Sequence, residues 1–298
     1  MNQTTPALGN FINHADLAAL IERTKAEDLG PDGLDVTSVH LIPTDRGGAA
    51  SIVARQHGTL AGAALLELIA STYDEAVQVR NVLTEGSALG VGTAVAELSG
   101  PVGGLLAIER VALNFLTHLC GIATLTASYV AAVAGTGATI CDTRKTLPGL
   151  RGLEKYAVAC GGGGNHRRGL HDAMLIKDNH LAYLSADRWE TQLRDAIRNA
   201  RAARPAPAFV EIEVDRIDQL RSTLACKPDF VLLDNMSTQQ LRQAVSIRNA
   251  EAPAVQLEAS GGVTLQTVRQ IAETGVDRIS VGAITHSAPA LDLAMDAL

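Results

Sequence analysis

Basic side chains that could bind and orient an anion are concentrated in one part of this chain. Residues 161–180 read GGGGNHRRGLHDAMLIKDNH, in which a run of four glycines precedes three histidines, two arginines and a lysine. Between positions 144 and 180 there are seven Lys or Arg residues and three acids, a local charge of +4, whereas the whole chain carries −7. A basic segment in an acidic protein is typical of a site for a small, highly charged anion such as a phosphate or a polycarboxylate.

Composition argues against several other classes of protein. Aromatic residues make up only 3% of the chain, so nucleic acid, which needs a broad basic face and stacking rings, is not expected as a partner. The first twenty residues lack a basic segment followed by a long apolar run, so we expect no secretory signal, no membrane anchor and a cytoplasmic location. The four cysteines (120, 141, 160 and 226) form no CxxC pair, and we expect free, buried thiols.

The first part of the chain mixes helical and strand patterns. Apolar spacing predicts a helix over residues 16–28 and a second in ALLELIASTYD. A long helical region over residues 104–134 is expected to be interrupted near Gly121. Short strands are expected at 50–55, 77–83 and 93–98.

After position 135 the pattern changes to short apolar runs that alternate with helical segments. The six runs are 139–141, 173–176, 209–214, 230–233, 255–257 and 278–281. This alternation predicts parallel strands joined by right-handed crossovers, in a doubly wound sheet or a (β/α) barrel. Because only six strands are evident, an incomplete barrel is the better prediction.

Polar residues and glycines stand where these apolar runs end. They are Asp142, Thr143, Arg144, Lys145, Lys177, Asp234, Ser260, Gly261, Gly262 and Gly282. The carboxyl ends of parallel strands share one edge in either architecture, so residues far apart in the sequence would meet in one pocket. The late glycines suit a phosphate, because loops without bulky side chains expose backbone N–H groups to an anion.

Acidic residues occupy one face of the strand FVEIEV. Glu211 and Glu213 alternate and therefore point to the same side, which we expect to be the barrel interior, with the valines and isoleucine facing the helices. Buried carboxylates need a cation or a hydrogen-bond partner. Glu213 and Asp234 are therefore candidates to hold Mg²⁺, directly or through water and substrate.

Two residues of the basic segment allow alternatives. Lys177 ends an apolar run, where a desolvated lysine could form a Schiff base as in an aldolase. His166 could act as a base or a metal ligand, but no histidine pair has metal-ligand spacing, and NHRR fits an anion-binding cluster better.

Together these residues resemble the quinolinate phosphoribosyltransferase family of type II phosphoribosyltransferases. The resemblance covers nearly the whole chain. Its motifs are EDLG (27–30), DVTS (35–38), ER-ALNFL (109–116), DTRKTLPGLR-LEKYAV (142–158), GGG-NHR-GL-D--LIKDNH (161–180), EIEV (211–214), LLDN (232–235), EASGG (258–262) and ISVGAITHS (279–287).

The resemblance implies an α/β fold with two domains. An N-terminal α/β sandwich domain would span residues 1–120 and an incomplete (β/α) barrel residues 121–284, with a tail over 285–298 that returns to the first domain. It also implies a homo-oligomer in which Arg110 completes the site of the neighbouring subunit. The helical pattern alone places Arg110 off the apolar stripe, as a solvated arginine.

The resemblance further implies what the site residues do. Arg144, His166 and Arg167 would hold the carboxylates of quinolinate, and Lys145 and Lys177 would flank the reacting groups. Glu213 and Asp234 would meet the ribose hydroxyls and Mg²⁺. The remaining expected substrate-binding residues, which include the 5-phosphate loops, are Thr143, Ser260, Gly261, Gly262, Gly282, Ala283 and His286.

The activity implied is that of a decarboxylating pentosyltransferase. Quinolinate and 5-phosphoribosyl 1-diphosphate would give nicotinate mononucleotide, diphosphate and CO2, a step of de novo NAD synthesis. A non-catalytic protein that binds a pyridine carboxylate or a nucleotide is the other alternative. Such a protein could dispense with Glu213 and Asp234, and the chain has both.

Overall fold

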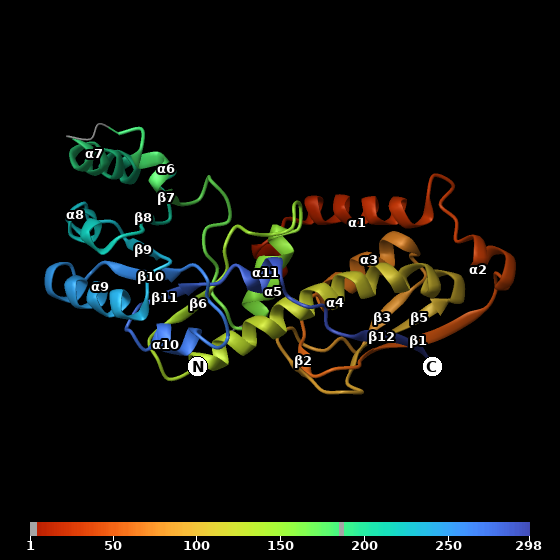
Figure 1. Ribbon diagram of the computed structural model, residues 1–298. Coiled ribbons are helices and arrows are strands. Elements are labelled where there is room, and N and C mark those ends of the chain that lie inside the picture. The colour runs from red at the N-terminus through yellow and green to blue at the C-terminus, as the bar shows by residue number, and fades with distance from the viewer. Residues whose placement is uncertain (1–4, 185–187) are drawn as a thin grey trace. The chain divides into compact units, whose positions relative to one another are not determined.

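The structure is a computed structural model that describes residues 5–184 and 188–298 (Figure 1). The chain forms two compact units. The first comprises Met1–Ala127, Thr146–Gly162 and Ile284–Leu298, and the second comprises Ser128–Lys145 and Gly163–Ala283.

An antiparallel sheet with helices packed on it forms the first unit. Its strands run in the order β12-β1-β5-β3, and every pair is antiparallel. The strands are β1 (Gly47–Ala54), β3 (Gln78–Arg80), β5 (Ala94–Pro101) and β12 (Leu293–Ala297), beside a small ribbon of β2 (Gly58–Thr59) and β4 (Ala88–Leu89). Strand β12 comes from the far end of the chain and pairs with β1 from Ala54↔Leu293 to Ala50↔Ala297.

The helices of the first unit agree with the expected pattern in outline. They are α1 (His14–Leu29), α2 (Val36–Leu41), α3 (Leu66–Tyr73), α4 (Val102–Ala132) and α5 (Arg151–Cys160), with short 3-10 turns at Leu8–Asn10 and Ala63–Leu65. Helix α1 begins because the side chain of Asn13 accepts the Asp16 N–H at 2.9 Å, which satisfies a backbone donor in the first turn.

The predicted interruption of the long helix near Gly121 is wrong. Helix α4 continues through this residue without a break. Gly121 serves close packing instead, because an added Cβ would lie 2.1 Å from the carbonyl oxygen of Pro289. Helix α4 is also long and apolar enough to cross a membrane, but 56% of its most apolar window is buried in the protein, as in the core helix of a globular protein.

Six parallel strands form the sheet of the second unit, in the order β6-β11-β10-β9-β8-β7. They are β6 (Thr139–Cys141), β7 (Met174–Ile176), β8 (Val210–Val214), β9 (Phe230–Asp234), β10 (Gln256–Ser260) and β11 (Arg278–Ser280). The six predicted strands are thereby confirmed. Strands β6 and β7 stand at the two ends of this order, so within the described residues the barrel is open, as predicted.

Helices follow most of these strands. They are α6 (Asp178–Leu181), α7 (Trp189–Ala202), α8 (Leu220–Ala225), α9 (Thr238–Glu251), α10 (Val268–Ala272) and α11 (Ala283–His286), with a 3-10 turn at Ile217–Gln219. Capping explains where α9 begins, because Ser237 and Gln240 exchange hydrogen bonds in a capping box.

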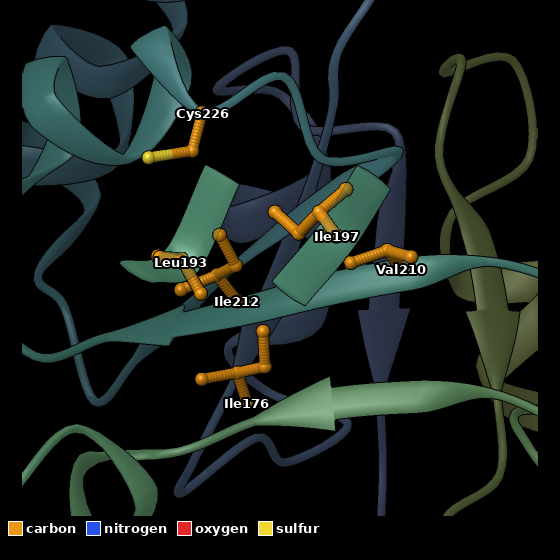
Figure 2. Packing of buried hydrophobic residues seen from close by; sticks show 6 residues of the cluster. All are labelled: Ile176, Leu193, Ile197, Val210, Ile212 and Cys226. Atoms are coloured by element: carbon orange, nitrogen blue, oxygen red, sulfur yellow. The ribbon is translucent and has the colours of Figure 1, made fainter. Parts of the chain in front are cut away.

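Side chains on the outer face of β8 anchor helix α7 (Figure 2). Val210 and Ile212 lie with Leu193 and Ile197 of α7 in one buried cluster, which Ile176 and Cys226 complete. Full burial of each such aliphatic side chain stabilises the fold by about 1.5–3 kcal/mol. Because these apolar residues face the helices, the alternating Glu211 and Glu213 must face the barrel interior, as predicted.

Candidate active site

A pocket of about 630 Å³ opens at the carboxyl ends of the strands of the second unit. Eleven of the residues predicted from the sequence line it. They are Thr143, Arg144, Lys145, His166, Arg167, Lys177, Glu213, Asp234, Ser260, Gly261 and Gly262. The structure thus brings together residues that are separated by up to 119 positions in the chain, from the ends of five different strands and the loops that follow them.

Asp142 holds the segment that carries His166. Its carboxylate is fully buried at the end of β6. It accepts the backbone N–H of His166 at 2.8 Å through Oδ1 and the side-chain amide of Asn165 at 2.6 Å through Oδ2. Gly164 adds a short parallel bridge to Cys141, with its N–H 2.7 Å from the carbonyl of Ile140. The glycine-rich segment is therefore tied to the edge strand of the barrel.

His166 is buried at the floor of the pocket, against acids from inside the barrel. Its Nε2 lies 2.8 Å from Oε2 of Glu211 and 3.5 Å from Oε1 of Glu258. Its Nδ1 accepts the backbone N–H of Arg167 at 2.7 Å. The ring therefore has polar protein contacts on both nitrogens.

Burial dominates the ionisation of the two inner glutamates. Loss of water raises the pKa of Glu211 from 4.5 to about 7, opposed by the charge of Arg278. Burial also raises the pKa of Glu258, to which the neighbouring charge of Glu211 adds. Desolvation lowers the pKa of Arg167, and the nearby charge of Arg144 acts in the same direction.

Lys177 and Glu213 form an ion pair on the wall of the pocket. Lys177 follows β7, and its Nζ donates to Oε2 of Glu213 on the neighbouring strand β8. The glutamate side chain is mostly buried and the lysine is 41% exposed. A Schiff-base lysine is desolvated, whereas Lys177 is partly exposed and paired with a carboxylate, so the arrangement argues against the aldolase alternative.

Asp234 and the loop after β10 form the opposite part of the lining. The side-chain amide of Asn235 donates to Oδ2 of Asp234 at 2.8 Å, and the backbone N–H of Asn235 donates to the carbonyl of Ser260 at 2.8 Å. Gly261 has φ +94° and lies so close that an added Cβ would be 2.2 Å from Oδ1 of Asn235. A glycine is therefore required at this position by both conformation and space.

The other predicted site residues are placed as follows. Gly282 and Ala283 follow β11, whose Ser280 lines the pocket. Arg110 and His286 belong to the first unit: Arg110 on α4 has a side chain that is 66% exposed, and Nδ1 of His286 lies 2.6 Å from Oγ of Ser287.

Sequence reasoning missed several residues of the site. Asn235, Glu258 and Ser280 also line the pocket, and Arg278 contacts the glutamates beneath it. Glu258 had a usable signal, because it precedes the predicted site residue Ser260 by two positions in a strand and therefore shares its face. Arg278 begins its strand and offered no comparable signal.

Glu213 and Asp234 are suited to Mg²⁺ by their chemistry. Both are oxygen donors on adjacent strands β8 and β9, both line the pocket, and hard divalent cations prefer carboxylate oxygens. Thr143, Arg144, Lys145, Arg167 and Lys177 surround the same space with donors for anions. The pocket can thus neutralise several negative charges and still present two carboxylates to a hydroxyl-bearing or cationic group.

The chain has an open parallel barrel with such a pocket and also a unit built on an antiparallel sheet. These features define a two-domain α/β enzyme of anionic substrates. The models of the quinolinate phosphoribosyl transferase N-terminal and C-terminal domains match residues 35–120 and 122–296. The chain therefore belongs to the quinolinate phosphoribosyltransferase family.

Individual relatives agree with this assignment. The chain is 44% identical to the nicotinate-nucleotide pyrophosphorylase [carboxylating] of Mycobacterium leprae, over 93% of this chain and 95% of the relative. It is 40% identical to a probable enzyme of the same name from Bacillus subtilis, over 96% and 94%. The solved structure of NadC from Streptococcus pyogenes superposes with a TM-score of 0.86 at 35% identity, covering 96% of this chain and 97% of that one.

Proposed function

We propose that the pocket binds quinolinate and 5-phosphoribosyl 1-diphosphate side by side and forms nicotinate mononucleotide, diphosphate and CO2. One observation carries this proposal: cations and carboxylates from the ends of the barrel strands and the loops that follow them line a single pocket. The family to which the chain belongs supports the same reaction, a step of NAD biosynthesis.

The basic part of the lining is suited to the pyridine dicarboxylate. Arg144 and Arg167 can each present a planar guanidinium to a carboxylate, which is the geometry for bidentate recognition. Lys145 and Lys177 add mobile ammonium groups beside them. Such fixed cations orient the ring so that its nitrogen faces the sugar.

The acidic part and the glycine loop are suited to the sugar phosphate. Glu213 and Asp234 would accept hydrogen bonds from the ribose hydroxyls and would hold Mg²⁺. The Ser260–Gly262 turn leaves room for the 5-phosphate, because Gly261 and Gly262 have positive φ and carry no side chain. When bound, Mg²⁺ supplies positive charge to the diphosphate leaving group.

The chemistry needs little acid or base catalysis from the chain. Departure of the diphosphate gives the ribose oxocarbenium character, which the carboxylates of Glu213 and Asp234 stabilise electrostatically. After the pyridine nitrogen has bonded to C1, the ring is positively charged and stabilises the carbanion that the loss of CO2 leaves. This carbanion then takes a proton from water to give nicotinate mononucleotide. The residues of the pocket therefore act by binding, charge neutralisation and orientation.

The setting of this reaction is also part of the proposal. We place the protein in the cytoplasm as a homo-oligomer of at least two chains, with Arg110 reaching the site of a neighbouring subunit. The exposed side chain of Arg110 on α4 is compatible with such a contact.

The direct test is to incubate the protein with quinolinate, phosphoribosyl diphosphate and Mg²⁺. Nicotinate mononucleotide and CO2 should appear in equal amounts, and removal of the metal by a chelator should stop the reaction. Nicotinate, which lacks the second carboxylate, should react far more slowly because it loses one set of cation contacts. A protein that binds both substrates but releases no CO2 would contradict the proposed function.

A further inference from the structure

Four charged or polar side chains form a cluster at and beneath the pocket, and the proposed substrate binding gives no role to three of them, Glu211, Glu258 and Arg278. Glu211 of β8 and Glu258 of β10 are fully buried, and Arg278 of β11 contacts both. The Nε of Arg278 donates to Oε2 of Glu258 at 2.6 Å, and its terminal nitrogen lies 3.4 Å from Oε1 of Glu211. The guanidinium also lies 3.6 Å from the centre of the Phe230 ring. Arg278, which lies against the ring of Phe230, thus holds both glutamates in place.

His166 is the fourth member of this cluster, and it contacts the carboxylate oxygen of each acid that Arg278 does not contact. Its Nε2 is 2.8 Å from Oε2 of Glu211 and 3.5 Å from Oε1 of Glu258. Within the described residues neither oxygen meets the geometry of a hydrogen bond, so His166 contacts them through electrostatic attraction. Negative charge on these oxygens favours a hydrogen on Nε2 over a lone pair.

The other ring nitrogen confirms which form of the ring is present. Nδ1 accepts the N–H of Arg167 at 2.7 Å, so it has a lone pair. A neutral imidazole has one donor and one acceptor nitrogen, and His166 is therefore the Nε2–H form. A metal ion bound by His166, Glu211 and Glu258, whose ligand atoms lie within 4.8 Å of one another, would need that lone pair on Nε2 instead.

We infer that Glu211 is a positioning residue for Arg167: it selects the Nε2–H form of His166, whose Nδ1 then holds the Arg167 backbone at the floor of the pocket. Glu258 and Arg278 keep Glu211 in place. The inference rests on the proposed function in one respect, that Arg167 binds a carboxylate of quinolinate. Glu211 itself need not touch the substrate.

The cost of this arrangement supports a role in orientation. Buried ion pairs stabilise a fold no better than apolar side chains of similar volume. An interior packed with leucine or methionine would therefore serve stability at least as well as Glu211, Glu258 and Arg278. What apolar side chains cannot do is choose one tautomer of His166, and groups that lock a binding residue in one geometry are what a precise site requires.

Two substitutions of similar volume at Glu211 separate a role in orienting His166 from a role in stability alone. Glu211→Met removes the oxygen that Nε2–H faces, whereas Glu211→Gln keeps an oxygen there. For Glu211→Met we expect the KM for quinolinate to rise about tenfold, the cost of about one polar contact, while the KM for phosphoribosyl diphosphate stays within about twofold. Glu211→Gln should stay close to the unmodified enzyme for both substrates. Equal losses for both substrates in Glu211→Met, or no loss, would overturn the inference.

A control removes a partly buried ion pair elsewhere in the barrel. Asp277 accepts from Arg248 at 2.6 Å and from the backbone N–H of Leu257 at 2.7 Å, at the start of β11. Asp277→Asn should lower the melting temperature without a selective change in the KM for quinolinate. A selective rise in the KM for quinolinate in Asp277→Asn would show that disturbing any ion pair in the barrel has this effect. That outcome would contradict the role inferred for Glu211.

Two further measurements test the path through His166. In a His166→Ala background, Glu211→Met should have no additional effect on the KM for quinolinate, because the group through which it acts is gone. Additive losses would contradict the inference. The ¹⁵N shifts of the His166 ring, recorded without substrate, should show protonated Nε2 in the unmodified protein and a tautomer mixture in Glu211→Met.

The spectroscopic measurement separates this inference from the proposed function. A protein that fails to turn over quinolinate but shows the tautomer change would contradict the proposed function alone. An unchanged tautomer in Glu211→Met would overturn the role of Glu211 even in a fully active enzyme.

Discussion

Side chains of opposite charge form ion pairs in and beneath this pocket. Lys177 pairs with Glu213, and Arg278 pairs with the two inner glutamates. Burial makes each such group costly unless it is compensated, which is why acids and bases from different strands contact one another here. Arg144 and Arg167 also line the pocket, and their planar guanidinium groups are suited to a dianionic ring.

Replacement of Arg144 tests which substrate the basic part of the lining serves. Arg144→Ala should weaken quinolinate binding by about tenfold to a hundredfold, because one or two charge-assisted hydrogen bonds are lost. Binding of phosphoribosyl diphosphate should change little. Titration of each substrate separately measures this, and equal losses for both would refute the assignment.

The buried Glu211 predicts a pH-dependent stability. Its pKa rises on folding from 4.5 to about 7, so between these values the folded state binds a proton that the unfolded state releases. The free energy of unfolding should therefore fall as pH rises through this window, by at most about 3 kcal/mol. Glu211→Gln cannot titrate, so its stability relative to the unmodified protein should improve from pH 4.5 to 8. Denaturant unfolding at several pH values checks this, and parallel curves would contradict it.

The loops after the strands are the elements that decide the geometry of the site. Asp142 fixes the glycine-rich segment, and Asn235 ties the end of β9 to the Ser260 carbonyl. The first connection runs from a buried carboxylate to the Asn165 amide and the His166 N–H, and the second joins two backbone groups, so both loops are held in place.

Gly261 allows a prediction at the level of the loop. Gly261→Ala forces an L residue to φ +94° and places Cβ 2.2 Å from Asn235, so the turn must shift. We expect the KM for phosphoribosyl diphosphate to rise about tenfold or more, with a smaller effect on quinolinate. Gly262→Ala is the matched comparison, because φ there is +60° and nothing lies within 4 Å of the added Cβ. If Gly262→Ala were the more harmful change, the packing argument would be wrong.

At the scale of the whole molecule, the chain builds one barrel that gathers the pocket residues and one unit that carries Arg110 on its surface. Helix α4 carries Arg110 with its side chain mostly exposed. An exposed arginine inside the family motif ER-ALNFL is a candidate for contact with another copy of the chain.

A mixing experiment tests whether Arg110 acts in a neighbouring subunit. Arg110→Ala and Lys177→Ala chains should each be nearly inactive alone. If Arg110 acts on the neighbouring site, hybrid dimers contain one intact site, and mixing should restore up to about a quarter of the full activity, from random pairing with one of two sites intact. No recovery after confirmed subunit exchange would count against the contact.

Much of the fold was predictable because it follows local rules. The apolar runs of the barrel strands are short and bounded by polar residues, so all six were recognised, and the alternation in FVEIEV correctly predicted which side chains face α7. The break expected at Gly121 was wrong because a tertiary contact with Pro289 explains that glycine and not a local turn. Arg278 was missed for the same reason, since its partners Glu211 and Glu258 come from other strands.

The sequence alone determined the class of fold, the polarity of the pocket and the residue types that surround it, because periodicity and strand ends are local properties of the chain. Only the tertiary structure decided which charges contact one another and which nitrogen of His166 faces Glu211. Those features depend on side chains that come from different strands, and no local pattern states how far apart their atoms lie once the barrel has closed around them.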